Sequence, residues 1–333
     1  MPAKIDGLHE EPGCLRGVQR LSAAALLLLL GACGGPDSPV PAPAEPEDTR
    51  LSVYAVNYPL AYFAERIGGD AVRVTLPVPA GVDPAHWRPA PEDILPFQQA
   101  DLILLNGAGY AAWVDTAALP NNRMVDTSRS FRDRLIRIED QATHSHGPEG
   151  EHSHGTTASH TWLDPLLALE QARAILVALI TYRPENEAEF RSHFILLERD
   201  LQALDEELTT VFKGLGDQPV LFSHPVYQYL ARRFVPDARS LNFEPDQVPD
   251  AAALAQLREL LTDDPATLLI WERKPYAVTV EMLESEGLRS LAFVPGANRP
   301  PEGDYLDLMR WNIANLSRVL PAEPQQDPPG DGA

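Results

Sequence analysis

The spacing of apolar residues divides the first half of the chain into alternating strand and helix segments. Residues 51–56 (LSVYAV) form a short β-type run, and Leu60, Phe63 and Ile67 then follow at helical spacing up to a Gly-Gly stop. Three further strand-type runs are VRVTLPV, DLILLNGAG and NRMVDTS, and APEDILPFQQA reads as a short helix between the first two. Strands that alternate with helices predict parallel βαβ units.

Two helical segments occupy the middle of the chain. The segment DPLLALEQARAILVALITYRP is an apolar helix, and residues 184–213 continue at spacings of three and four with no internal breaker. A helix of about thirty residues spans roughly 45 Å, which exceeds one small domain. It is therefore suited to join two lobes.

The strand and helix alternation restarts after this helix. PVLFS, ATLLIW and SLAFV read as strands, and four helical segments accompany them. We therefore predict an α/β fold of two lobes, each with a small parallel sheet flanked by helices, joined by one long rigid helix. The predicted parts are an N-terminal lobe over 51–183, the connecting helix over 184–213 and a C-terminal lobe over 214–321.

The N-terminal segment has the pattern of an export signal. Arg16 and Arg20 precede an apolar run of about ten residues, which is too short to span a membrane. The run ends in Leu-Gly-Ala-Cys, which resembles a bacterial lipobox with Cys33 as the lipidated residue. The alternative is an ordinary cleaved signal with an incidental cysteine. We predict a lipoprotein signal peptide over 1–32, a Pro-rich tether over 33–50 and a disordered tail over 322–333.

The charge balance restricts the partners. The formal net charge is −21, and the 333 residues include only two cysteines, one of which lies within the signal. An acidic chain is repelled by nucleic acid, and it suits cations, although solubility alone explains such a charge. One remaining cysteine allows no internal disulfide, so the fold depends on a large apolar core.

Histidines are concentrated in one polar stretch. Four of the nine lie in HSHGPEGEHSHG, within the predicted His-rich loop over 140–159: His144, His146, His152 and His154. The stretch has no apolar residue and therefore does not belong to a core. Its imidazoles and carboxylates offer weak, adaptable metal contacts, and ordering a loop costs entropy. We interpret it as an accessory metal-binding loop; a solvated loop without a role is the alternative.

Four motifs, in order, resemble those of metal-specific solute-binding proteins of bacterial ABC transporters. PAGVDPAHWRPAPEDI resembles the family loop Gly-x-Asp-Pro-His-x-Tyr-x-Pro-x-Pro, and HTWLDP resembles its His-x-Trp-Leu-Asp-Pro segment. FSHPVYQYLARRF resembles its His-x-x-Tyr-x-Tyr turn, and GDYLDLMRWNIANL its closing helix. A His-rich loop before the second motif is typical of the zinc-binding members. The resemblance covers nearly all of residues 51–320.

The resemblance implies that metal is held in the cleft between two lobes. The histidines in matching segments are His86, His160 and His224. His224 also follows a predicted strand, and ligand sites of open α/β sheets lie at the carboxyl ends of strands. Neutral imidazoles are favourable zinc ligands, and for each histidine a hydrogen-bonded structural role is the alternative.

The sequence departs from the family pattern at two positions. Ala85 holds the place of the family histidine, so His86 is shifted by one residue. Val294 holds the place of the Asp that often supplies a fourth ligand. Glu272, at the end of a predicted strand, is the nearest substitute, although it can instead pair with Arg273 or Lys274.

Several neighbouring side chains have simpler interpretations. Asp164 is expected to cap a helix, and His193 to be exposed on the connecting helix. Glu244 can approach the cleft but reads more simply as a loop acid. The aromatic residues near the motifs are expected to pack around the cleft, and a dry shell that shields the metal is the functional alternative: Trp87, Tyr227 and Trp271.

The resemblance implies capture of a divalent transition metal for delivery to an ABC permease, not catalysis. Three histidines favour zinc over the harder Mn²⁺. We expect a monomer, anchored by lipid in the periplasm or on the extracellular face, that binds no nucleic acid. Two other functions remain open: a surface adhesion or scaffold lipoprotein, and a zinc-dependent hydrolase. The hydrolase lacks support, because the chain has no HExxH motif.

Overall fold

Two parallel four-stranded sheets organise the molecule. The computed structural model describes residues 48–138, 143–145, 151–153, 157–263 and 265–320. The first sheet has the order β2-β1-β3-β4, and the second the order β10-β9-β7-β8. Their strands are β1 (Leu51–Ala55), β2 (Val72–Thr75), β3 (Leu102–Leu105), β4 (Met124–Asp126), β7 (Val220–Phe222), β8 (Arg239–Ser240), β9 (Leu268–Trp271) and β10 (Arg289–Ala292).

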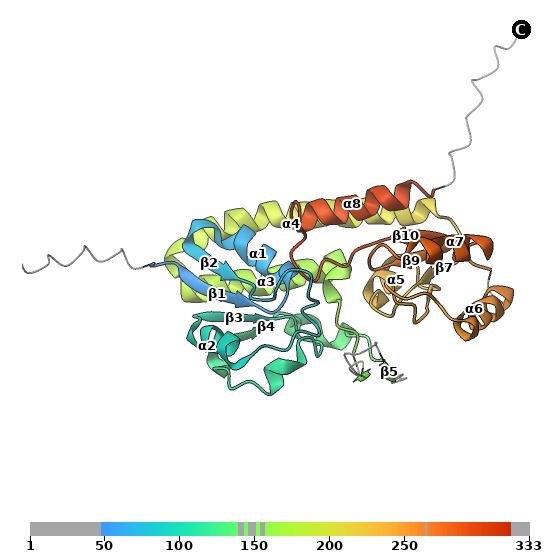
Figure 1. The fold of residues 1–333 in the computed structure, drawn as a ribbon. Helices are drawn as coiled ribbons and strands as arrows, with labels where there is room; N and C mark the ends of the chain where they lie inside the picture. The colour runs from blue at the N-terminus through green and yellow to red at the C-terminus, as the bar shows by residue number, and fades with distance from the viewer. Residues whose placement is uncertain (1–47, 139–142, 146–150, 154–156, 264, 321–333) are drawn as a thin grey trace, which may run out of the picture. The chain divides into compact units, whose positions relative to one another are not determined.

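Helices cover both sheets, and one long helix runs along both halves of the molecule (Figure 1). In the first half they are α1 (Tyr58–Gly68), α2 (Pro91–Gln99) and α3 (Pro165–Tyr182), and the long α4 (Glu187–Gly214) lies between the two sheets in sequence. In the second half they are α5 (Gln228–Phe234), α6 (Ala251–Asp263), α7 (Ala277–Ser285) and α8 (Tyr305–Ser317). The predicted α/β fold with two sheets and one long connecting helix is confirmed.

The first strand and helix show how local sequence produces these elements. Along β1, Val53 and Ala55 face one apolar cluster while Tyr54 faces another, because successive side chains point to opposite faces of a sheet. The Asn57 side chain then accepts a hydrogen bond from the Leu60 amide at 3.2 Å and begins α1. Gly69, at φ 51°, ends it.

Three elements differ from the sequence prediction. The strand β8 has only two residues, both exposed, and lacks the apolar run that would have revealed it. The long helix begins at Glu187, since Pro184–Asn186 forms a separate 3-10 turn. The His-rich segment is not wholly a loop, because β5 (Thr143–Ser145) pairs antiparallel with β6 (Glu151–Ser153).

One large apolar cluster extends through both sheets. One cluster of buried residues contains Val53 and Leu104 of the first sheet, Phe222 and Ile270 of the second, and the buried face of α4. The apolar residues of α4 keep spacings of three and four along the helix: Phe190, Phe194, Leu197, Leu201, Leu204, Leu208 and Val211. The helix therefore belongs to the core of both halves.

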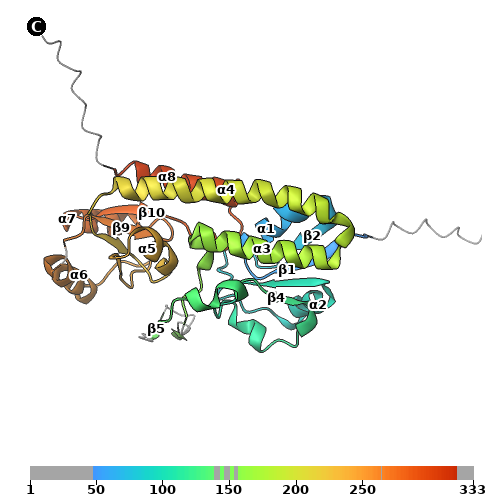
Figure 2. The ribbon, with the colours of Figure 1, turned by 180° about the vertical axis from the view of Figure 1, so that it is seen from behind.

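The chain after β10 forms a second link between the halves. The Pro295 carbonyl accepts a hydrogen bond from Trp162 Nε1 at 2.8 Å, and the Ala297 carbonyl accepts one from the Tyr58 amide at 2.8 Å. Arg299 forms an ion pair with Glu65 of α1 at 2.8 Å. From there α8 runs beside α4, as both ribbon views show (Figures 1 and 2).

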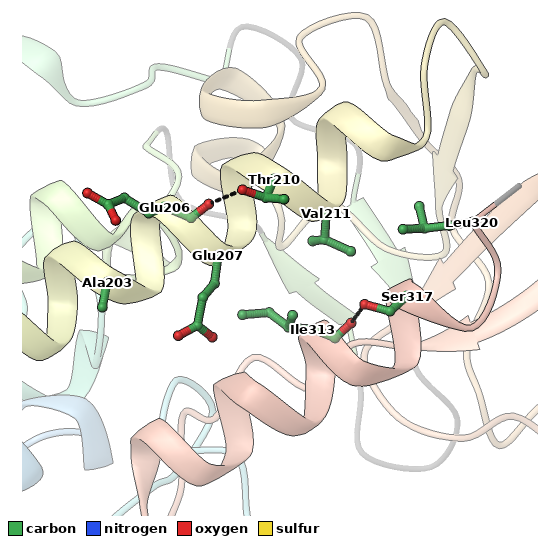
Figure 3. Close-up of a pocket in the computed structure, with 8 residues that line it drawn as sticks. All are labelled: Ala203, Glu206, Glu207, Thr210, Val211, Ile313, Ser317 and Leu320. Carbon is green, nitrogen blue, oxygen red and sulfur yellow. Dashed lines mark hydrogen bonds between the residues drawn. The ribbon is translucent and has the colours of Figure 1, made fainter. Parts of the chain in front are cut away.

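A groove of about 510 Å³ lies between α4 and α8 (Figure 3). The close-up shows Glu207 of α4 extending into the space between the two helices. The lining residues are Ala203, Glu206, Glu207, Thr210, Val211, Ile313, Ser317 and Leu320. None of them is a histidine or one of the candidate metal ligands.

Helix α3 is long and apolar enough to cross a membrane, with a mean hydropathy of 1.4 over its 18 residues. More than half of the helix is buried within the protein, and it packs against α1 and α4, as a core helix does.

Candidate metal centre

His160 lies at the carboxyl-end side of the first sheet, in the short segment before α3. Its side chain is buried, with 8% of the residue exposed. The imidazole packs against two aromatic rings, at 4.9 Å between ring centroids for Trp162 and 6.0 Å for Tyr110. Tyr110 follows β3 in the Gly-rich loop. Ligand sites of open α/β sheets lie at such carboxyl ends of strands, but the sequence analysis did not single out this tyrosine.

The loop that carries His86 turns Ala85, which holds the place of the family histidine, toward the core and turns His86 toward solvent. The Asp83 side chain accepts a hydrogen bond from the Ala85 amide at 2.9 Å, and the His86 amide donates to the Asp83 carbonyl at 3.1 Å. This tight turn leaves Ala85 packed against the core and His86 exposed. The one-residue shift seen in the sequence therefore changes which side chain faces the interior.

His224 follows β7 of the second sheet and is also buried, with 7% of the residue exposed. Its Nδ1 lies 3.4 Å from Oε1 of Glu244, whose side chain is 18% exposed. The structure thus gives Glu244 a buried histidine partner, which the simpler reading as a loop acid missed. No sequence signal marks this pair, because the nineteen residues between them contain a helix and a strand.

Glu272 directly follows β9 at the same edge of the second sheet. Burial raises the pKa of its carboxyl group to about 7, and the neighbouring carboxylate of Glu244 adds to the rise. The charge of Glu272 in turn raises the pKa of Tyr227, which burial already holds well above its usual value. Arg273 forms an ion pair with Asp246 at 3.2 Å, and its charge also lowers the pKa of Glu272, although burial and Glu244 raise that pKa by more.

Asp83 connects the two halves of this region electrostatically. Its carboxylate raises the pKa of Glu272, and it also raises the pKa of buried Tyr110, for which burial is the larger cause. The loop of the first half therefore lies near the end of β9. Within the described part of the chain, however, no three or more His, Cys, Asp or Glu side chains are grouped closely enough to hold a metal ion.

The simpler interpretations of the surrounding residues are mostly confirmed. Asp164 caps α3 by accepting a hydrogen bond from the Leu166 amide at 3.0 Å. The packing roles of the three aromatic residues are confirmed: Trp87 lies edge-on to Trp113, Tyr227 stacks on Phe222, and Trp271 is buried in the second sheet.

The prediction for His193 was wrong. The residue is partly buried, because its Nδ1 lies 3.1 Å from the carbonyl oxygen of Ile67 at the end of α1. It therefore connects α4 to α1.

The accessory residues are only partly visible. The backbones of His144 and His152 are directly paired across the β5–β6 hairpin. His146, His154 and the predicted lipidation site Cys33 lie outside the described residues.

Comparison with known proteins places this geometry in a family. Residues 53–319 match the sequence model of the family described as ZnuA, zinc-uptake complex component A, periplasmic. The high-affinity zinc uptake system protein ZnuA of Bacillus subtilis is 29% identical over 311 residues, covering 89% of this chain and 95% of that protein. The manganese ABC transporter substrate-binding lipoprotein PsaA of Streptococcus pneumoniae is 26% identical over 323 residues, covering 92% and 98%.

A solved structure has the same fold. The metal-dependent lipoprotein YcdH of Bacillus subtilis superposes with a TM-score of 0.69 at 24% identity, over 81% of this chain and 99% of that one. Together with the family match over residues 53–319, this agreement establishes that the chain belongs to the ZnuA family of metal-binding solute-binding proteins of ABC transporters.

Proposed function

We propose that the protein captures zinc outside the cytoplasmic membrane and delivers it to the permease of an ABC transporter. The observation that carries the proposal is the pair of buried histidines, His160 after the first sheet and His224 after the second. Buried imidazoles are suited to hold a divalent cation, and His224 also lies at a strand end beside the carboxylate of Glu244.

The proposed ligands are His86, His160 and His224, with Glu272 as the fourth. Imidazole nitrogens and one carboxylate oxygen meet the tetrahedral preference of Zn²⁺. His86 is exposed, so the loop after Asp83 has to turn its imidazole inward when zinc binds. The buried Glu272 carboxyl group releases its proton to the solvent as the cation replaces it.

Zinc is favoured over manganese by the number of imidazoles in this set. Borderline-soft nitrogen ligands suit zinc, whereas Mn²⁺ prefers carboxylate and carbonyl oxygen. The two named relatives bind different metals by their names, zinc and manganese, so family membership alone does not choose between them.

The remaining parts of the proposal concern location and partners. Lipid attached to Cys33 anchors a monomer in the periplasm or on the extracellular face, and residues 33–50 tether it. The predicted lobes are 51–183 and 214–321, with 184–213 between them. The protein is not an enzyme and binds no nucleic acid, which a net charge of −21 disfavours.

Zinc titration against a competing chelator tests the proposal. We expect His160→Ala and His224→Ala each to weaken the tight site at least about a hundredfold, or about 2.7 kcal/mol. His193→Ala is the control, because that histidine contacts the Ile67 carbonyl in α1 and lies outside the ligand set. Zinc affinity equal to the parent's in both His160→Ala and His224→Ala would show that the proposed site is wrong. Displacement of zinc by a tenfold excess of Mn²⁺ would show that the proposed metal is wrong.

A further inference from the structure

Five fully buried polar side chains form a network at the carboxyl end of the first sheet: Asn57, Asn106, Thr127, Thr161 and Gln171. None of them has any exposed surface, so their polar groups have to find partners within the protein. Burying this many polar groups in a core costs free energy unless each is hydrogen-bonded, and a half-satisfied network is worse than an apolar core.

The network is well satisfied. Oδ1 of Asn106 lies within hydrogen-bond distance of three donors: Nδ2 of Asn57 at 3.1 Å, Nε2 of Gln171 at 3.1 Å and Oγ1 of Thr161 at 3.4 Å. Gln171 also donates to Oγ1 of Thr127 at 3.0 Å and accepts from Oγ1 of Thr161 at 3.2 Å. Asn57, Asn106 and Thr127 follow β1, β3 and β4, whereas Thr161 lies just before α3 and Gln171 within it. The network therefore joins the sheet edge to that helix and to the turn before it.

Two members of the network hold the residues on either side of His160. Nδ2 of Asn106 donates a hydrogen bond to the Ser159 carbonyl at 2.8 Å. On the other side, the Thr161 hydroxyl lies between Asn106 and Gln171. The Ser159 backbone and the Thr161 side chain, on the two sides of the histidine, are thereby fixed to the sheet edge.

The loop that follows Asn106 adds a third restraint. Ala108 and Ala111 have φ values of 54° and 57°, in the left-handed region that L-residues other than glycine, asparagine and aspartate rarely adopt. Between them, Tyr110 is buried and places its ring edge against the His160 imidazole. Strained backbone persists only where its surroundings require it, and here it brings an aromatic wall against the histidine.

We infer that Thr161, Asn106 and Gln171 are positioning residues for zinc capture: they fix the imidazole of His160 before zinc arrives. The inference rests on the proposed function, in which His160 is a ligand. Groups that orient a ligand without touching the metal raise affinity by lowering the ordering cost of binding. A packing role alone would instead affect stability and leave the zinc affinity of the folded protein unchanged.

Two identical substitutions on either side of Gln171 separate these roles. Thr161→Val and Thr127→Val each replace one buried hydroxyl group by a methyl group. Both hydroxyl groups contact the Gln171 side chain. We expect Thr161→Val to weaken zinc binding about tenfold or more and Thr127→Val by less than about twofold, although both lower the midpoint of denaturant unfolding. Thr161→Ser keeps the hydroxyl and should keep the parent's affinity.

A second measurement uses cobalt in place of zinc. The visible spectrum of the cobalt-loaded protein reports ligand geometry, and we expect it to change in Thr161→Val and not in Thr127→Val. Asn106→Ser, which shortens the side chain that donates to Ser159, should resemble Thr161→Val. Equal zinc affinities and equal cobalt spectra in the two Val variants would overturn the inference. The variant His160→Ala separates the proposed zinc site from the positioning role. If it binds zinc like the parent, the proposed site is wrong. If it loses zinc while the Thr161 and Asn106 variants keep the parent's affinity, the site stands and only the positioning role is refuted.

Discussion

Folding moves the ionisation of the Glu272 carboxyl group into the neutral pH range. Its carboxyl group is removed from water at the end of β9 and lies near the carboxylate of Glu244, so the charged form is disfavoured and the pKa rises to about 7. An acid whose pKa is raised by folding binds more protons in the folded than in the unfolded state between about pH 4.5 and pH 7. The contribution of Glu272 to stability is therefore favourable below this window and is lost as the pH rises through it.

This sign gives a prediction for the metal-free protein. Removing the charge by Glu272→Gln should increase the free energy of unfolding relative to the parent as the pH rises from 5 to 8, by up to about 3 kcal/mol. Denaturant unfolding in the presence of a chelator measures the difference. Glu284→Gln, at an exposed position of α7, controls for the loss of one negative charge. A difference for Glu272→Gln that stays constant across this pH range would show that the carboxyl group is not held in a desolvated environment.

The turn at Asp83 gives a second prediction at the residue scale. Ala85 faces the core beside the Tyr110 hydroxyl, whereas His86 is exposed and has to reorient before it can bind metal. The double variant Ala85→His/His86→Ala moves the histidine to position 85. It should bind zinc at least as tightly as the parent, since less reorganisation of the loop is needed. Chelator competition measures the affinity, with His86→Ala alone as the control that is expected to lose affinity. If both variants lose affinity equally, position 85 does not face the metal.

At the scale of elements, the sequence predicted what depends on local periodicity. The helix α1 and the strand β9 follow from apolar spacing, turn residues and strand length, so both were placed within one or two residues. The strand β8 was missed because two exposed residues carry no pattern.

In the candidate site, too, local sequence patterns did not reveal contacts between distant segments. Motif resemblance identified His160 and His224, but the contact between His224 and Glu244 depends on how the segment from α5 to β8 folds back. The hydrogen bonds of Asn106 likewise depend on the three-dimensional arrangement of several strand ends. No local pattern encodes such long-range contacts.

The hairpin formed by β5 and β6 gives a prediction at this scale. Replacing residues 144–155 by a short Gly/Ser linker should lower the zinc stoichiometry and change the affinity of the tight site by less than about tenfold, or 1.4 kcal/mol. The proposed tight site takes no ligand from these residues, and the accessory role proposed for their histidines is weaker, additional metal binding. Calorimetry measures both quantities. A loss of tight binding by several orders of magnitude would make a hairpin histidine a primary ligand.

At the scale of the whole molecule, the continuous core restricts how the two halves can move. Side chains of both sheets and of α4 share one apolar cluster, so a wide hinge opening would expose buried apolar surface at about 25 cal/mol for each Å². The segment after β10 adds a second connection. The two hydrogen bonds that Nδ2 of Asn298 donates, to the carbonyls of Pro79 and Val82 at 2.8 Å, hold the loop that precedes Asp83.

These restraints predict that zinc rearranges loops more than it rotates the two halves. Small-angle scattering of the protein without its signal and Cys33 should give a radius of gyration that changes by less than about 1 Å when zinc binds. The double variant Asn298→Ala/Arg299→Ala removes the hydrogen bonds to the loop before Asp83 and the ion pair with Glu65, so its radius should change more. Arg310→Ala, at an exposed position of α8, is the control for the loss of one arginine. A large compaction of the parent on zinc binding would mean that the core opens and closes as metal enters, and that neither α4 nor the segment after β10 limits the movement.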